Sequence, residues 1–528
     1  MKKIIFLIVS IYNLNISGYG QEWIRIYGQG MNAVARDVKE DYDKGFDIAG
    51  MVNNYTYAWL IKTDVNGNML WNQRFGNGNY LIATENVEKT NDGGYILCGT
   101  TEKYGSYDAY LLKLNACAEP EWCKVIETPD NPDDMGIKVK QTPEGDYVML
   151  CGYFVTEPFS NISLFKFKST GELIWHKFYP MGNLDYNDEP NDLLIDTDGY
   201  LITADRYYPD PGTTSPGILR SYFSKTDTAG NEVWNLVYGT NDYYYSWPWE
   251  TIKNQYGNYY NTCTHTDFNT GDNPAIIKVL HGGTESYNHD IVTTNNFNLS
   301  GMGTIDVLND TNFVMAGGWI LNNIQTNVFI KTDTLGNLIK TKELPLTTYG
   351  AISTAKTKDN KFLSVSNDAT GGTWKIYAFK VNSNLEYDSI YTIPYMYDSL
   401  CPHPIVSDTV DPDCENEYVD IEEPFTSPET TKLKVFPNPS SDKVTIEMPK
   451  YLVLSNAKSK IPSTTIYHQW KSVMLEVYDI AGKKVMEREI NKSETKLDLD
   501  VSEWGKGMYA FRLVYQKQEV GNAKVVVQ

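Results

Sequence analysis

A short pattern recurs along most of the chain and constrains its fold more than any other feature. In its clearest copy, Asn91, Asp92 and Gly93 form a turn signal, because these residue types tolerate the positive φ of tight hairpins. The mostly apolar segment Tyr95–Cys98 follows, and the aromatic and aliphatic segment Ala109–Leu114 comes after it. Both segments have the composition of short β-strands. The pattern therefore predicts a repeated β-sheet unit.

Six further copies have the same order of turn, strand and strand. Their first turns lie at Asp43–Gly45, Glu144–Asp146, Asp198–Gly199, Tyr256–Asn258, Asp310–Asn312 and Asp359–Lys361. In several copies a second turn leads to a tryptophan, as Asn66–Asn68 leads to Trp71. The copies are spaced roughly 50 to 58 residues apart, which is in the range of propeller blades.

Each copy is interpreted as four strands in a meander, A to D, with the tryptophan on D. One such sheet leaves its edges and both faces uncovered and is not stable alone. Radial stacking of several sheets buries those faces. We therefore expect an all-β chain with a seven-bladed β-propeller over residues 21–400. A solenoid is the alternative, although solenoid repeats are shorter and more regular. Ring closure stays open, because either Glu22–Gly28 or Leu385–Ile393 fits the last D strand.

The N-terminus has the features of a secretory signal peptide over residues 1–20. Lys2 and Lys3 precede the apolar run Ile4–Ile11, and small residues precede Gln21, the expected mature start. The run is too short to span a bilayer, and no other stretch is long and apolar enough to do so. The formal net charge of -21 makes a general affinity for nucleic acid or anionic lipid unexpected.

The seven cysteines fall into two groups. Cys117 with Cys123, and Cys401 with Cys414, are predicted as two local disulfides of an exported protein. The other three, near the ends of B strands, are predicted to be buried small hydrophobic residues: Cys98, Cys151 and Cys263. A zinc site is the alternative for the cysteines, but no CxxC and no nearby His pair supports it.

Residues 401–431 are rich in proline and acidic residues and lack the repeat, so an extended linker is expected there. Residues 432–528 then have the alternating pattern of a small all-β unit. Four motifs occur in it: Phe436-Pro437-Asn438-Pro439, a hairpin from Tyr478 to Val485 that includes Asp479, Gly482 and Lys483, the strand Gly507–Tyr509, and the strand Lys524–Val527.

In these motifs and their order, the last hundred or so residues closely resemble the type A C-terminal sorting domain of type IX secretion substrates. The resemblance implies an immunoglobulin-like β-sandwich and the type IX machinery as a partner. It also implies removal of the domain when the cargo is released or attached to surface lipopolysaccharide. The expected location is secreted or outer cell surface. Extra sequence between Met448 and Met474 departs from the family, whose members bridge these strands more briefly.

Candidate site residues come from the long connections of the repeat. In a meander, the B–C and D–A connections lie on one face, and variable loops on a rigid scaffold commonly carry function. These loops supply aromatic rings and carboxylates: Asp185, Tyr186, Tyr243, Tyr244, Tyr245, Trp247, Trp249 and Asp267. Such rings stack on sugar faces and carboxylates accept hydroxyl donors, so we expect binding of an extracellular glycan or protein. The alternative is that the rings only pack loops against blade edges.

Catalysis has weaker support in the sequence. Loop carboxylates such as Asp185, Asp188, Glu189 and Asp267 fit a carbohydrate-active hydrolase or lyase at the channel mouth. However, GxSxG, HExxH and P-loop motifs are absent, and no catalytic residue is assigned. A structural surface component is the third reading. Asp196–Gly199 begins like a calcium loop but lacks its later ligands, so an A–B turn is expected there, with calcium as the alternative and no other cofactor expected.

Overall fold

The computed structural model describes residues 23–128, 133–156, 159–179, 188–208, 218–238, 245–267, 271–291, 298–321, 324–344, 349–419, 431–447, 473–490, 496–515 and 518–528. Every regular element in these ranges is a β-strand. None of these residues forms a helix long and apolar enough to cross a membrane. The predicted signal peptide, residues 1–20, lies outside the described ranges. The chain divides near residue 420 into two compact units.

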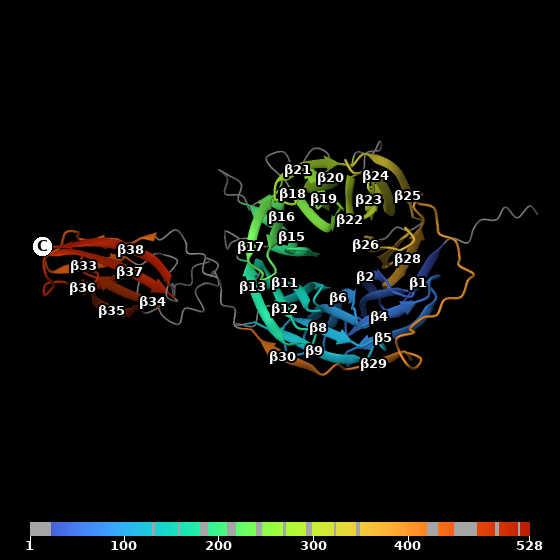
Figure 1. Cartoon of the computed structure of the whole chain (residues 1–528), viewed down its shortest axis with the longest axis horizontal. Coiled ribbons are helices and arrows are strands. Elements are labelled where there is room, and N and C mark those ends of the chain that lie inside the picture. Colours follow the sequence, from blue (N-terminus) through green and yellow to red (C-terminus); the bar gives the residue numbers. More distant parts are fainter. Residues whose placement is uncertain are drawn as a thin grey trace, which may run out of the picture. The chain divides into compact units, whose positions relative to one another are not determined.

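The first unit consists of antiparallel four-stranded sheets, which we call blades (Figure 1). Blade 1 comprises β2 (Val34–Glu40), β3 (Phe46–Val52), β4 (Tyr57–Thr63) and β5 (Met69–Phe75). Blade 2 comprises β6 (Ile82–Lys89), β7 (Tyr95–Thr101), β8 (Asp108–Leu114) and β9 (Pro120–Glu127). Blade 3 comprises β10 (Asp133–Gln141), β11 (Tyr147–Thr156), β12 (Phe159–Phe167) and β13 (Leu173–Tyr179).

The remaining blades repeat this order. Blade 4 comprises β14 (Asp188–Asp196), β15 (Gly199–Tyr208), β16 (Ile218–Thr226) and β17 (Glu232–Val237), and blade 5 comprises β18 (Tyr245–Lys253), β19 (Tyr259–Asp267), β20 (Gly271–Val279) and β21 (Glu285–Asp290). Blade 6 comprises β22 (Asn298–Asn309), β23 (Asn312–Leu321), β24 (Ile324–Asp333) and β25 (Leu338–Glu343). Blade 7 comprises β26 (Tyr349–Lys356), β27 (Phe362–Asp368), β28 (Lys375–Val381) and β1 (Ile24–Tyr27).

The first strands of the blades form a closed inner ring. Each inner strand contacts the inner strand of the next blade in the order β2, β6, β10, β14, β18, β22, β26 and back to β2. Figure 1 shows the sheets arranged radially around this ring. The unit is therefore a β-propeller, as the repeat predicts.

The N-terminal strand closes the ring. β1 pairs antiparallel with β28 from Ile24↔Phe379 to Tyr27↔Ile376, so the first strand of the chain is the outer strand of the last blade. Of the two segments that the sequence leaves open for this position, Glu22–Gly28 is the one used. In the second segment, Leu385–Ile393, Tyr387 makes only an isolated bridge to Val381.

Tryptophans on the outer strands join neighbouring blades. Each packs against an aromatic residue at the start of the second strand of the next blade, with ring centroids 6.0 to 6.3 Å apart: Trp71 on Tyr95, Trp122 on Tyr147, Trp175 on Tyr200, Trp234 on Tyr259, and Trp23, just before β1, on Phe46 across the closure. For all of these rings except that of Trp71, a turn glycine of the next blade covers the same ring. At Gly171, which has φ 85°, a Cβ would lie 2.9 Å from the Trp122 ring. The repeated Trp and Gly are thus parts of one contact.

Residues 382–419, which we call the strap, begin against blade 7, where Asp388 pairs with Lys361, and then run along blades 1 and 2. Within it, β29 (Asp408–Val410) pairs parallel with β5, and β30 (Cys414–Tyr418) pairs parallel with β9, so both blades gain a fifth strand. The first part of the segment predicted as a linker, residues 401–419, is therefore built into the propeller. This happens because the outer strands β5 and β9 have open edges that an extended, proline-rich chain can join.

Because of the strap, the disulfide pairing differs from the pairing that the sequence predicts. All four predicted cysteines are bonded, but the predicted local pairs are wrong: Cys117 bonds Cys401 and Cys123 bonds Cys414. The physical reason is that the strap returns along blade 2 and places each of its cysteines beside one from that blade. The three other cysteines are free and buried, as predicted: Cys98, Cys151 and Cys263.

The second unit consists of two sheets around one core. One sheet has the order β31 (Thr431–Lys432), β38 (Gln518–Val527), β37 (Gly507–Tyr515), β34 (Val473–Tyr478), β35 (Lys484–Ile490), and the other has the order β32 (Lys434–Phe436), β33 (Lys443–Glu447), β36 (Lys496–Asp500). Val444, Val477, Phe511 and Val525 are fully buried between them. The insertion between Met448 and Met474 lies, except for its last residue Val473, outside the described ranges.

The motif residues of the sorting-domain resemblance make hydrogen bonds that hold the turns and strand ends of this unit. Asn438, between Pro437 and Pro439 in the turn after Phe436, donates to the Lys524 carbonyl at 2.7 Å and accepts from the Val526 N–H at 2.9 Å. The Asp479 carboxylate accepts the turn N–H groups of Ala481 and Lys483, each at 2.9 Å, and Gly482 supplies the positive φ of 77°. Tyr478 begins this turn, Gly507 begins β37, and the Tyr509 hydroxyl donates to the Gly505 carbonyl at 2.7 Å.

Candidate functional site

Half of the eight predicted site residues lie on connections that the structure does not describe. Asp185, Tyr186, Tyr243 and Tyr244 are outside the described ranges. Tyr245 begins β18 and Asp267 ends β19, and the pairing of Tyr245 with Thr266 brings these two strand ends to the same edge of blade 5. Trp247 and Trp249 lie in β18.

His265, a neighbour of these residues in the sequence, is buried rather than displayed. Its Nδ1 lies 2.7 Å from Asp290 Oδ1 and its Nε2 lies 3.2 Å from Cys263 Sγ. Burial disfavours the charged imidazole, but Cys263 and Asp290 outweigh it and raise the pKa of His265 to about 10. The side chain therefore tightens blade 5 internally.

A bulge interrupts every inner strand, at the same level of the ring. The register shifts lie between Ala35/Asp37, Thr84/Asn86, Gly136/Lys138, Pro190/Asp192, Pro248/Thr251, Met302/Thr304 and Ala351/Ser353. A bulge leaves one residue unpaired and disrupts the local ladder. In blade 5 the unpaired residues are Trp249 and Glu250. At each bulge, backbone N–H groups of the inner strand are thus left without a partner in their own sheet.

Polar side chains at these bulges form a hydrogen-bonded belt from blade to blade. Five of them accept a backbone N–H of the following blade: Asp37 from Val87 at 3.2 Å, Asn86 from Val139 at 2.9 Å, Asp192 from Thr251 at 2.8 Å, Glu250 from Ile305 at 3.0 Å, and Ser353 from Val38 at 3.3 Å. Buried N–H groups need such partners. The belt therefore satisfies inner-strand N–H groups and holds neighbouring blades together.

A cavity of about 100 Å³ lies along this belt. It is lined by Lys138, Asn191, Asp192, Trp249, Glu250, Gly303, Thr304, Ile352 and Ser353, which come from the inner strands of blades 3 to 7. We call it the axial cavity. Trp249 is 43% exposed, and its Nε1 donates to Thr264 Oγ1 at 3.1 Å, which fixes the ring. The axial cavity therefore combines an oriented aromatic ring with amide, carboxyl and ammonium groups.

The carboxyl groups of this region are crowded. Burial, and then the nearby Asp192 carboxylate, raise the pKa of Glu250 to about 8, against the opposing effect of Lys138 and Lys39. Burial likewise raises the pKa of Asp306 to about 6. Burial acts in the opposite direction on Lys138, yet the carboxylates of Asp37 and Asp192 raise its pKa. At neutral pH Glu250 is thus mostly protonated.

The size of the axial cavity limits what can enter it. At about 100 Å³ it is small compared with the pockets of about 300–1,000 Å³ that enclose small-molecule ligands. A single projecting group of a ligand can enter it, but it cannot enclose an oligosaccharide. A larger ligand has to lie mainly outside the cavity, against Trp249.

Sequence reasoning found Trp249 from its aromatic neighbourhood but missed Lys138, Asn191, Asp192 and Glu250. The signal was present, since polar residues recur at a fixed offset before each A–B turn. It was overlooked because these residues sit inside predicted strands rather than in long loops.

The C-terminal unit matches a known family. Residues 434–528 match the family model described as secretion system C-terminal sorting domain. With its propeller and this tail, the chain has the architecture of an exported β-propeller protein. It is secreted or attached to the outer cell surface, as the resemblance of its motifs implies. No curated protein matches the sequence.

Several solved structures are similar to the chain in fold. A polysaccharide lyase of a new family, the PL25 ulvan lyase, has a TM-score of 0.46 at 10% identity and covers 67% of this chain and 94% of its own. The β-propeller domain of the Trilobed protease from Pyrococcus furiosus has a TM-score of 0.39 at 9% identity and covers 69% of this chain and 99% of its own. Drosophila plexin A, in complex with semaphorin 1b, has a TM-score of 0.42 at 7% identity and covers 68% of this chain and 87% of its own. At these identities the likeness concerns the fold alone.

Proposed function

We propose that the protein is an exported β-propeller that binds an extracellular glycan or protein through its long-loop face, with a glycan as the preferred ligand. One observation carries this proposal: the exposed Trp249 ring is held in place beside a cavity lined by polar groups. Tyr and Trp rings offer an apolar face with a polar edge. Asp192 and Asn191 are suited to sugar hydroxyls, while the ring covers the apolar face of the same sugar.

The test uses the mature full-length chain on a glycan array. Trp249→Ala should abolish retention of the bound glycan while leaving the thermal midpoint nearly unchanged, because the ring is only half-buried. Tyr256→Ala is the matched control, since Tyr256 is a 71% exposed aromatic in the A–B turn of the same blade. If both variants bind like the wild type, or if wild type binds no glycan, the glycan proposal fails and a protein partner takes its place.

A carbohydrate-active hydrolase or lyase is the second candidate. It is favoured by Glu250, whose raised pKa of about 8 keeps it mostly protonated at neutral pH next to Asp192, because a carboxyl group with a raised pKa suits general-acid work. Reducing-end release should be measured on every glycan that the array retains. Release that is lost in Glu250→Gln would make the protein an enzyme, and retention without release would make it a binding protein.

A further inference from the structure

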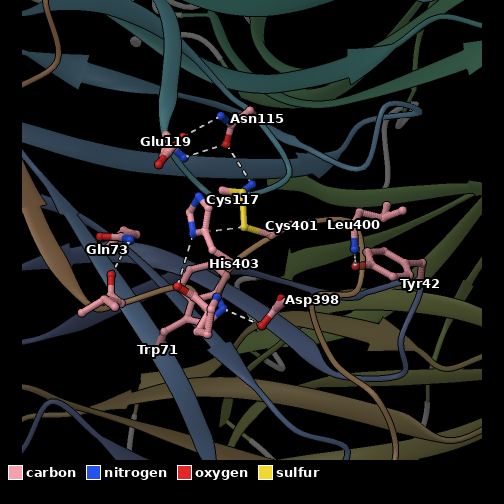
Figure 2. Close-up of a disulfide and its surroundings, with 12 residues drawn as sticks. Tyr42, Trp71, Gln73, Asn115, Cys117, Glu119, Asp398, Leu400, Cys401 and His403 are labelled. Carbon is pink, nitrogen blue, oxygen red and sulfur yellow. Dashed lines mark hydrogen bonds between the residues drawn. A yellow bond between two sulfur atoms is a disulfide. The ribbon is translucent and has the colours of Figure 1, made fainter.

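The surroundings of the Cys117–Cys401 disulfide contain a third metal-ligating group. Figure 2 shows the His403 ring facing the sulfur of Cys401, with Nδ1 to Sγ at 3.7 Å. One ligand atom from each of Cys117, Cys401 and His403 lies within 4.8 Å of the other two. His403 is exposed, whereas each cysteine is 8% exposed. Among the described residues this is the one group of three such side chains with metal-binding spacing.

Contacts independent of the disulfide hold both sides of this group. On blade 2, the Cys117 N–H donates to Asn115 Oδ1 at 2.8 Å. On the strap, Trp71 Nε1 donates to Asp398 Oδ2 at 2.9 Å, and Gln73 bonds the backbone of Val406 and Asp408 at 3.0 Å each. These contacts flank Cys401 and His403 in the sequence. The three side chains therefore stay adjacent when the sulfur–sulfur bond is absent.

Two thiolates and an imidazole are ligands that zinc prefers. Zinc binds thiolate sulfur at about 2.3 Å and imidazole nitrogen at 2.0–2.1 Å in tetrahedral geometry, which separates sulfur from nitrogen by about 3.6 Å. The observed separation between Cys401 Sγ and His403 Nδ1 is 3.7 Å. Because His403 is exposed, solvent can supply the fourth ligand.

We propose that reduction of the Cys117–Cys401 disulfide creates a zinc site with Cys117, Cys401 and His403 as ligands. A dithiol reductant supplies two electrons and two protons, is itself oxidised to a disulfide, and leaves two thiols. Zn²⁺ then displaces both thiol protons to solvent. His403 binds through Nδ1 as its Nε2–H tautomer and gives up its long 3.4 Å contact with the Pro404 carbonyl. The metal replaces the disulfide as the link between strap and blade 2.

The second disulfide provides an internal contrast. Cys123 and Cys414 belong to a buried hydrophobic cluster between blades 1 and 2, and among the described residues no third metal-ligating side chain lies at a suitable distance from them. They also sit on the paired strands β9 and β30, opposite each other in register. Reduction there leaves only two sulfur ligands, so zinc binding should be confined to the first pair.

The test titrates cobalt(II), a spectroscopic substitute for zinc, into the full-length mature chain. A Cys123→Ser/Cys414→Ser variant leaves one disulfide, and it is compared before and after reduction with a phosphine. The reduced form should bind one cobalt with a thiolate charge-transfer band that zinc abolishes, while the oxidised form should show no such band. Zinc should also protect Cys117 and Cys401 from alkylation.

Matched variants decide the outcome. His403→Ala should weaken binding at least roughly tenfold. His281→Ala, which removes a histidine whose side chain is 47% exposed elsewhere on the propeller, should leave binding unchanged. The proposal is overturned if the reduced chain binds no metal, if His403→Ala binds like wild type, or if the Cys117→Ser/Cys401→Ser variant shows the same band. Loss of the native circular-dichroism spectrum on reduction also overturns it, because the site requires a docked strap.

Discussion

The ring of Trp23 meets the ring of Phe46 edge-on, with centroids 6.3 Å apart and an interplanar angle of 89°. Trp23 precedes the outer strand of blade 7, while Phe46 begins the second strand of blade 1, so this contact lies across the junction where the chain closes its ring. The indole is fully buried. Closure therefore depends on an aromatic contact as well as on the four residues of β1.

Replacement of Trp23 by alanine should destabilise the propeller by about 3–5 kcal/mol, the usual cost of removing a large buried ring. The measurement is the shift of the urea midpoint. Val233→Ala is the control, since Val233 is 64% exposed on β17, and surface changes of this kind stay within about 0.5 kcal/mol. A shift for Trp23→Ala no larger than that of the control would show that β1 closes the ring without it.

Non-reducing peptide mapping should recover Cys117 linked to Cys401 and Cys123 linked to Cys414. The strap carries Cys401 and Cys414 along blade 2, where the paired Cα atoms are 4.9 Å and 4.3 Å apart. Recovery of a Cys117–Cys123 peptide would contradict the docked strap, because that bond can form only if Cys401 and Cys414 are elsewhere.

A propeller truncated after Leu400 should be less stable than one truncated after Val419. The shorter chain lacks both fifth strands and both disulfides, and loss of one native disulfide costs about 2–5 kcal/mol. Thermal midpoints of the two chains provide the measurement. A Cys117→Ser/Cys123→Ser/Cys401→Ser/Cys414→Ser variant of the longer chain separates the disulfides from the strands. Equal midpoints for the two truncations would mean that the strap adds nothing to the propeller.

The propeller could be predicted because its signals are local. The turn at Asn91–Gly93 and the strand that begins at Tyr95 are neighbours in sequence, and the same period repeats along the chain. The disulfides could not be predicted, since Cys117 and Cys401 are 284 residues apart and meet only because the strap turns back along the blades. A rule that pairs the nearest cysteines fails whenever the chain returns on itself.

Some residues of the candidate site could be predicted from local sequence, and others could not. Trp249 stood out because aromatic residues crowd the sequence around it. Glu250 did not, because its importance arises from a bulge that brings it to the inner ring, where it accepts the Ile305 N–H from the next blade. The polar residue that recurs before each A–B turn marks these positions in the sequence, but it does not show that the strand shifts register there, because a register shift depends on pairing between strands. His403 was missed because it lies near Cys117 only in the folded protein, where the strap returns to blade 2.

The raised pKa of Glu250 predicts a dependence of stability on pH. Burial and Asp192 move this pKa from 4.5 to about 8, so the folded protein keeps a proton that the unfolded chain releases. The contribution of Glu250 to the free energy of unfolding is fully present below about pH 4.5. It falls as the pH rises from there to about 8, and above that pH it stays constant. Glu250→Gln removes the titration, while the amide oxygen can still accept the Ile305 N–H.

Urea midpoints of wild type and Glu250→Gln at about pH 5 and about pH 8 provide the measurement. The variant should gain stability relative to wild type at the higher pH, because only the wild type then carries a buried charge beside Asp192. Glu172→Gln is the control, since it makes the same chemical change at a side chain that is 65% exposed. Parallel pH profiles for Glu250→Gln and wild type would mean that Glu250 is ionised in the folded protein, and the acid–base role of the second candidate function would lose its support.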